Sequence, residues 1–427
     1  MNHTADAVII GAGVIGSSIA LELVRDGLSV VVVDKAGAAG QGSTSASSAV
    51  IRYNYSTWDG IATAWEAKHG WEKWADHLGG VDEAGMARFH RVGKVFLDVD
   101  IAPMDRVLVM FDRAGIPYEL WDADELARRV PGLDPGRFWP PKRIDDPEFW
   151  EDSSRRLGAL WTPDAGFVDD PALAAVNLAN AAQRLGAQFL FSKVVTEVLG
   201  DGAVSGVRLD DGSTVSAPIV VNAAGPWSGT LNALAGVGEG WTVTTRPMRQ
   251  EVHHVPAPPG FNDMDNGTEI GPCIADLDLG VYMRGTPGNG LLLGGTEPEC
   301  DPLEWVDDPD AINPNPTQAV YEAQATRVAR RLPDLGIPSK SSGIAGVYDV
   351  TEDWTPIYDA TEREGFFVAI GTSGNQFKNA PVVGKIMSQV IKGERTLVGA
   401  HTGLEIDLSA FSRTRARNAD STGTVMG

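Results

Sequence analysis

The sequence predicts an α/β fold, α+β overall, and the beginning of the chain carries the clearest evidence. A short β-branched run over 7–10 leads directly into a glycine-rich turn over 11–16. Apolar residues then recur every fourth position over 15–23, which is the period of an amphipathic helix. A second apolar run over 29–33 follows, so that strand, turn, helix and strand come in the order of a Rossmann-like βαβ unit.

The glycines of this turn each have a physical reason. Gly11 allows the sharp turn, Gly13 lets a pyrophosphate approach the helix N-terminus, and Gly16 lets helix and strand pack closely. Gly27 ends the expected helix, and the second strand closes on Asp34, whose carboxylate would accept hydrogen bonds from an adenosine ribose. A carboxylate there disfavours a 2′-phosphate, so the pattern predicts FAD or NAD rather than NADP. A plain βαβ unit without a ligand is the alternative.

A run of small, hydroxyl-bearing residues over 40–48 follows, where the chain leaving the second strand would pass over the cofactor. Backbone amides and the hydroxyls of Ser43, Thr44 and Ser45 could hold diphosphate and ribityl oxygens, and 46–50 would pass beside a flavin ring. A flexible surface loop is the alternative interpretation.

The composition is typical of a folded protein with two or three domains: 427 residues, 43% hydrophobic and 22% charged. With 57 acidic and 35 basic residues, the net charge is −22, which disfavours nucleic acid and anionic membranes as partners. Cys273 and Cys300 are too few for a disulfide framework and wrongly spaced for a structural zinc site. We therefore expect a cytoplasmic protein with no metal, no export signal and no transmembrane helix.

Taken together, 11–16, Asp34 and 42–48 resemble the FAD-dependent D-amino-acid oxidase superfamily, especially the branch of monomeric sarcosine oxidase and glycine oxidase. The segment over 194–227, read as strand, hairpin and buried strand, is similar to the family's FAD-contacting sheet. The segments over 346–357 and 365–378 resemble the family's last two motifs. The apolar helix expected over 380–391 would point its N-terminus at the flavin, where the helix dipole stabilises negative charge.

The resemblance implies a Rossmann-like FAD-binding domain interleaved with a second domain whose mostly antiparallel sheet covers the flavin. We assign 1–90, 151–240 and 341–427 to the FAD-binding domain, and 91–150 and 241–340 to the substrate-binding domain. The expected cofactor-binding residues are Gly11, Gly13, Val14, Ile15, Gly16, Asp34, Lys35, Gly42, Ser43, Thr44, Ser45, Val195, Ala224, Gly225, Trp227, Gly346, Gly374, Asn375, Gln376, Phe377 and Lys378.

The resemblance also implies a site for the substrate's carboxylate, formed by Arg52 and Lys378. A guanidinium fork and an ammonium together would fix the carboxylate and place the α-carbon against the flavin; solvated surface charges are the alternative. Tyr348 and Tyr282 match positions near the flavin and could orient the substrate, although buried tyrosines often only satisfy a core hydrogen bond. Arg284 would either add a third cation or face solvent.

Two departures from the family pattern limit the resemblance. Gly346 stands where sarcosine oxidases carry the cysteine that bonds to the flavin, so we expect noncovalent FAD. The lysine that promotes oxygen reduction in that branch is absent near Leu292. The prediction that O2 accepts the electrons is therefore less secure than the prediction that FAD is bound.

The expected reaction is the oxidation of the C–N bond of an amino acid, with O2 reduced to H2O2. The substrate expected is an N-substituted glycine or another secondary amine carrying a carboxylate. Four tryptophans over 58–74 could line a pocket for a large N-substituent or could be ordinary core. The alternatives are an FAD-dependent dehydrogenase of an amino or hydroxy acid using another acceptor, an NAD-dependent dehydrogenase and a noncatalytic nucleotide-binding protein. The oligomeric state stays open, and the tail over 412–427 is expected to be frayed.

Overall fold

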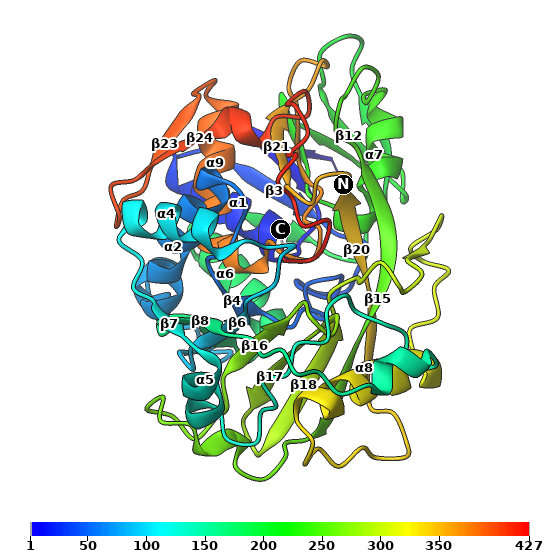
Figure 1. The fold of residues 1–427 in the computed structure, drawn as a ribbon. Helices are drawn as coiled ribbons and strands as arrows, with labels where there is room; N and C mark the ends of the chain where they lie inside the picture. The colour runs from blue at the N-terminus through cyan, green and yellow to red at the C-terminus, as the bar shows by residue number, and fades with distance from the viewer. Residues whose placement is uncertain (1, 427) are drawn as a thin grey trace.

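The computed structural model describes residues 2–426, and its predicted βαβ unit forms the centre of a six-stranded sheet (Figure 1). The strand order is β10-β3-β2-β14-β22-β21. Apolar residues occupy both faces of the central strands, as expected for a parallel sheet covered on both sides. All neighbours pair in parallel except β21 and β22. The strands are β2 (Ala7–Ile10), β3 (Val30–Val33), β10 (Gln188–Leu190), β14 (Ile219–Asn222), β21 (Ile357–Ala360) and β22 (Phe366–Ile370).

The helix that follows the glycine-rich turn, α1 (Val14–Arg25), packs against α6 (Pro171–Arg184) and α9 (Ala380–Ile391). Gly16 in α1 is required by close approach, since a Cβ there would lie 1.9 Å from the Gly11 carbonyl oxygen. The helix expected over 380–391 is confirmed as α9 with the same bounds.

A second, larger sheet lies below the first in Figure 1 and is mostly antiparallel, as expected. Its order is β19-β15-β18-β17-β16-β6-β8-β7, with β20 also paired to β15. Only β6 and β16 pair in parallel within it, among the described residues. The strands are β6 (Lys94–Leu97), β7 (Glu119–Trp121), β8 (Ala159–Thr162), β15 (Thr245–Pro256), β16 (Cys273–Asp276), β17 (Val281–Thr286), β18 (Gly290–Gly295), β19 (Glu304–Trp305) and β20 (Gly343–Thr351).

Smaller sheets flank these two. The hairpin expected near 195–209 is confirmed as β11 (Val195–Leu199) and β12 (Gly206–Leu209), which continue through β13 (Thr214–Ser216) to β1 (His3–Thr4). A three-stranded sheet joins β4 (Val50–Ile51), β9 (Gly166–Val168) and β5 (Phe89–His90). The hairpin of β23 (Thr396–Val398) and β24 (Glu405–Asp407) completes the set. The division into two interleaved domains stays a prediction.

The remaining helices cover the outer faces, and none within residues 2–426 is long and apolar enough to cross a membrane. They are α2 (Trp58–Glu72), α3 (Trp74–Leu78), α4 (Met104–Ala114), α5 (Ala123–Arg129), α7 (Ser228–Ala235) and α8 (Gln318–Arg331). The tryptophans over 58–74 pack into the core or against it, and none lines the cavity described below. The idea that they form a substrate pocket is therefore wrong.

The tail over 412–426 is ordered, so the expectation of a frayed end is also wrong. Arg415 Nη2 pairs with Asp353 Oδ1 at 2.7 Å, and Val425 and Met426 are buried. In Figure 1 this red segment runs back over the middle of the molecule. The tail is poor in apolar residues, but specific ion pairs and hydrogen bonds hold it, which composition alone does not reveal.

Candidate functional site

A cavity of about 750 Å³ extends from the glycine-rich turn to the large sheet. One end is lined by Asp34 and by Gly11, Gly13, Val14 and Ile15 of the glycine-rich turn, and the other by Arg52, Lys378 and residues of β16 and β17. One continuous cavity therefore joins the nucleotide motif to the cationic residues, as a dinucleotide site with an adjoining substrate site requires.

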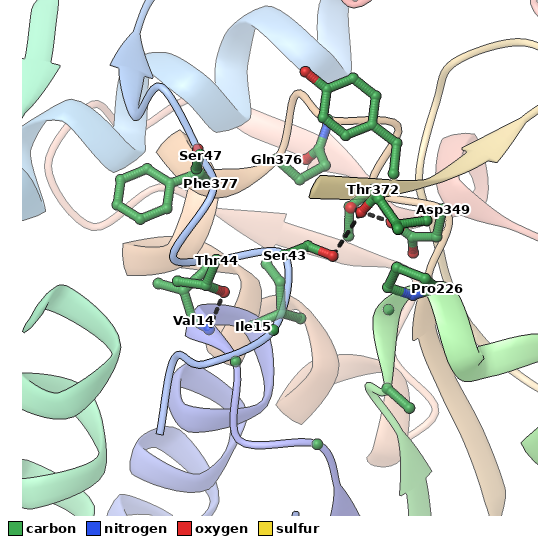
Figure 2. A pocket seen from close by; sticks show the side chains of 18 of the residues that line it. Val14, Ile15, Ser43, Thr44, Ser47, Pro226, Asp349, Thr372, Gln376 and Phe377 are labelled. Atoms are coloured by element: carbon green, nitrogen blue, oxygen red, sulfur yellow. Dashed lines mark hydrogen bonds between the residues drawn. The ribbon is translucent and has the colours of Figure 1, made fainter. Parts of the chain in front are cut away.

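At the nucleotide end the backbone is open and rich in donors. Gly11 has a φ of +110°, and a Cβ there would lie 2.4 Å from the Ala223 carbonyl oxygen, so only glycine fits this turn. Thr44 Oγ1 accepts a hydrogen bond from Val14 N–H at 3.1 Å and ties the serine-rich loop to the start of α1 (Figure 2). Ser43 Oγ donates to the Val347 carbonyl at 2.6 Å, which ties the same loop to β20.

Asp34 is fixed by its own neighbours at the end of β3. Its Oδ2 accepts from Ala12 N–H at 2.6 Å and its Oδ1 from Ala36 N–H at 2.7 Å. The carboxylate thus lies beside the glycine-rich turn at the nucleotide end of the cavity. A ribose hydroxyl can add a further hydrogen bond to it there.

Most residues predicted to bind the cofactor line this cavity. Three do not: Gly16, which serves helix packing; Ser45, whose hydroxyl donates to the Gly42 carbonyl at 2.9 Å; and Gly346, where a Cβ would meet that of Ala46 at 2.7 Å. Those that line it are Gly11, Gly13, Val14, Ile15, Asp34, Lys35, Gly42, Ser43, Thr44, Val195, Ala224, Gly225, Trp227, Gly374, Asn375, Gln376, Phe377 and Lys378.

Arg52 and Lys378 meet at the other end of the cavity, and both are only 4% exposed. Lys378 Nζ donates to the Tyr55 hydroxyl at 3.0 Å, and the Arg52 guanidinium lies 4.9 Å from the centre of the Tyr55 ring. Neither cation forms an ion pair with a carboxylate anywhere in residues 2–426. Buried cations without counterions are costly, so this end of the cavity is suited to an anionic ligand.

A third buried cation, Lys94, also lines the cavity and was not predicted from the sequence. Its Nζ donates to Asn54 Oδ1 at 3.1 Å and lies 4.6 Å from the centre of the Phe96 ring. Burial, and then the charge of Arg52, hold the pKa of Lys94 well below its usual value. The sequence offered one indication of this residue, since Lys94 is the first residue of an otherwise apolar strand. No motif identifies it as part of a site.

The two predicted tyrosines line the cavity from two strands of the large sheet, Tyr282 from β17 and Tyr348 from β20. Burial raises the pKa of Tyr282 to about 12, and its hydroxyl is hydrogen-bonded to Ser48. Burial also raises the pKa of Tyr348 well above its usual value, so both phenols stay protonated. Arg284 is buried rather than solvent-facing, and its guanidinium donates to the Ser48 carbonyl at 2.9 Å.

The C-terminal tail closes the cationic end. The Val425 carbonyl accepts from Arg52 Nη2 at 2.7 Å, and Val425 N–H donates to Glu297 Oε2 at 2.8 Å. Glu297 Oε1 has no hydrogen-bond partner among the described residues, and burial raises the pKa of this carboxyl to about 8. Sequence inspection missed Glu297 because nothing adjacent to it marks a buried acid.

Two further positions bear on redox chemistry. Leu292 on β18 is buried in a cluster with Tyr282 and Val252, and the position carries an apolar side chain in place of an ammonium. Cys273 lines the cavity, but burial raises the pKa of its thiol to about 12, and its Sγ donates to the Gly166 carbonyl. A protonated thiol is a poor nucleophile, so Cys273 is unsuited to bond to a ring in the cavity.

Comparisons with known proteins agree with this architecture. The profile of the family described as "FAD dependent oxidoreductase" matches residues 6–390. Glycine oxidase of Geobacillus kaustophilus is 26% identical over 432 residues, which cover 97% of this chain and 98% of the relative. The 4-methylaminobutanoate oxidase (formaldehyde-forming) of Paenarthrobacter nicotinovorans is 26% identical, over 90% of this chain and 43% of the relative. The crystal structure of L-proline dehydrogenase from P. horikoshii superposes with a TM-score of 0.76 at 23% identity, over 97% of this chain and 98% of the other.

Proposed function

Because the chain belongs to the family of FAD dependent oxidoreductases, we propose that it oxidises the C–N bond of an amino acid held at the cationic end of its cavity. The expected substrate is an N-substituted glycine or another secondary amine with a carboxylate. One observation carries the proposal: Arg52 and Lys378 are buried side by side around Tyr55 with no protein carboxylate among residues 2–426 to neutralise them.

The nucleotide end of the cavity fits FAD. A diphosphate requires close approach to the backbone and hydrogen-bond donors, which the Gly11 turn and the serine-rich loop supply. A ribose requires an acceptor, which Asp34 supplies. FAD is bound noncovalently, since Gly346 offers no side chain that could bond to it. Family membership also decides between the two dinucleotides in favour of FAD over NAD.

The residues of the chain then have separate tasks in the reaction. Arg52 and Lys378 bind the substrate carboxylate and orient the α-carbon, while the buried walls exclude water. FAD supplies the acceptor for the hydride equivalent that leaves the α-carbon. The substrate amine reacts in its neutral form, so no strong protein base is needed. The imine formed is released and hydrolysed to an amine and an oxo acid, and O2 takes up two electrons and two protons to give H2O2.

A dehydrogenase that passes its electrons to another carrier is the second candidate. Leu292, at the position where the resembled branch carries an oxygen-promoting lysine, favours it. The names of the relatives support either acceptor, since the glycine oxidase and the L-proline dehydrogenase share the fold with this chain.

Anaerobic mixing of the FAD-loaded protein with N-alkylglycines, glycine, proline and sarcosine tests the proposal, because loss of the visible flavin band reports reduction without O2. Admitting O2 and measuring peroxide, in parallel with reduction of an artificial dye, then separates oxidase from dehydrogenase. If no amine in the panel bleaches the flavin, the proposed function is wrong.

The carboxylate site is tested by Arg52→Met and Lys378→Met. Loss of one charged partner costs about 2 to 4 kcal/mol, which corresponds to roughly a 30- to 700-fold rise in KM. FAD content should stay unchanged, because neither side chain belongs to the nucleotide end. Lys340→Met, which removes an exposed lysine, is the control. An unchanged KM in both cavity variants would exclude this binding mode.

A further inference from the structure

The cationic end of the cavity holds three basic side chains, Arg52, Lys94 and Lys378, which is more than one carboxylate pairs with. Arg52 lies between the other two cations: it shares Tyr55 with Lys378 and Asn54 with Lys94, since the Arg52 guanidinium donates to the Asn54 carbonyl and Lys94 Nζ to the Asn54 side chain. All three cations are 2–4% exposed and line the same cavity.

The partners of Lys94 are all uncharged. They are the Asn54 amide oxygen, the Phe96 ring and the neighbouring Cys273 thiol, which burial keeps protonated. Within residues 2–426, Lys94 forms no ion pair. In the empty protein burial favours the neutral amine of Lys94, and an anionic ligand beside it favours the ammonium.

Asn54, the hydrogen-bond partner of Lys94, lies behind the cavity lining. Asn54 is buried, its Oδ1 accepts from Lys94, and its Nδ2 has no hydrogen-bond acceptor among the described residues. Lys94 thus lines the cavity with one neutral acceptor, the Asn54 amide oxygen, so its amino group is a donor available to a carboxylate in the cavity.

We infer that Lys94, positioned by its hydrogen bond to Asn54, forms a second acid-binding position, and that the preferred substrate is a secondary amino acid with two carboxylates. One carboxylate binds to Arg52 and Lys378, and the acid on the N-substituent binds to Lys94. The inference rests on the proposed function and narrows it to N-(carboxyalkyl)glycines. A diacid gives an anionic partner both to the pair Arg52 and Lys378 and to Lys94, whereas an N-alkylglycine leaves Lys94 against a methyl group.

The first test compares matched substrates in the FAD-loaded wild-type protein. Iminodiacetate, N-(2-carboxyethyl)glycine and N-(3-carboxypropyl)glycine are each set against the analogue in which methyl replaces the second acid: N-ethyl-, N-propyl- and N-butylglycine. The quantity compared is the rate constant of flavin bleaching divided by the substrate KM. A charge-assisted hydrogen bond should make this quotient roughly 10- to 100-fold larger for the best diacid than for its methyl analogue.

Variants at Lys94 assign this preference to the residue. Lys94→Met should abolish the diacid preference and slow the N-alkylglycines much less than the diacids, because their carboxylate stays with Arg52 and Lys378. Lys94→Arg should keep most of the preference, and Lys340→Met should keep all of it. Replacing a buried unpaired lysine with a similarly shaped apolar residue is neutral or stabilising, so Lys94→Met should fold and bind FAD.

Binding without turnover gives an independent measurement. Glutarate, which has two acids and no amine, should perturb the flavin spectrum of the wild-type protein at roughly 10-fold lower concentration than butyrate, and Lys94→Met should remove the difference.

The outcomes separate the two proposals. If no amine bleaches the flavin, the proposed function fails and this inference with it. If N-alkylglycines bleach it as well as the diacids do and Lys94→Met changes neither, only the second acid position fails. If Lys94→Met slows monoacids and diacids equally, Lys94 acts in the common reaction, and the second acid position is again refuted.

Discussion

Glu297 gives the sharpest stability prediction, because a buried carboxyl with a strongly raised pKa makes folding sensitive to pH. Burial raises its pKa from 4.5 to about 8, against the opposing hydrogen bond from Val425 N–H. The folded protein therefore holds a proton on this group, between pH 4.5 and 8, that the unfolded chain has lost. Stability is full below this window and declines as the pH rises through it.

The size of the effect follows from the same shift. Three and a half pKa units correspond to at most about 5 kcal/mol, and structural relaxation around the ionised carboxylate reduces this to about 2 to 5 kcal/mol. With an unfolding entropy of about 2.1 cal/mol/K per residue, a protein of this length should lose roughly 2 to 5 °C of Tm for that energy.

The variant Glu297→Gln isolates this contribution. Glutamine keeps the acceptor for Val425 N–H and cannot ionise, so the variant should match the wild type at about pH 5 and exceed its Tm by those few degrees at about pH 9. The assay is thermal unfolding followed by FAD fluorescence and circular dichroism, at saturating FAD, in half-unit pH steps. Parallel profiles for the two proteins would refute the reasoning and mean that water or a cation satisfies the ionised carboxylate.

The cofactor turn and the tail give two further predictions. Gly11→Ala should lower FAD content and cost about 2 to 4 kcal/mol, because it combines a left-handed φ with a Cβ 2.4 Å from the Ala223 carbonyl oxygen; the measurement is flavin absorbance per protein, and full FAD occupancy would contradict it. Arg415→Met should cost about 3 to 5 kcal/mol by leaving the buried Asp353 carboxylate unpaired. Limited proteolysis should then cut the tail over 412–426 earlier than in the wild type, and an unchanged cleavage pattern would show that other contacts hold it.

The variants Gly11→Ala and Arg415→Met each have a matched control elsewhere in the chain. Gly229 lies in α7, and a Cβ added to it would meet no atom within 4 Å, so Gly229→Ala should be neutral or stabilise by up to about 1 kcal/mol. Arg417, whose side chain is 59% exposed, pairs with Glu352 at the surface, so Arg417→Met should change stability by less than about 1 kcal/mol.

The nucleotide end could be predicted from the sequence because its determinants are local. The turn over 11–16, the helix after it and Asp34 lie within one βαβ unit, so their spacing along the chain fixes their spacing in space. Arg52 and Lys378, which line one cavity from distant parts of the chain, were found only through the resemblance, since nothing local joins them.

The remaining features depend on contacts between distant segments. Lys94, Glu297 and Val425 come from three separate parts of the sequence, and each lacks a neighbouring residue that marks it. The tail was misjudged for a related reason: its polar residues suggested solvation, whereas Arg415 finds a buried partner 62 positions away. The composition of a segment gives its average polarity. It does not show whether a particular charged side chain has an ion-pair partner elsewhere in the fold.

The order of the six-stranded sheet has a consequence for how the protein is made. β2 is synthesised before its neighbour β14, and β14 must wait for β22, residues 366–370, before its second edge is covered. Until then the nascent chain exposes an unpaired, β-branched strand edge, which is prone to association with other chains. The sheet that carries the nucleotide turn is therefore complete only after β22 has been made, and a fragment that stops before β22 is expected to aggregate.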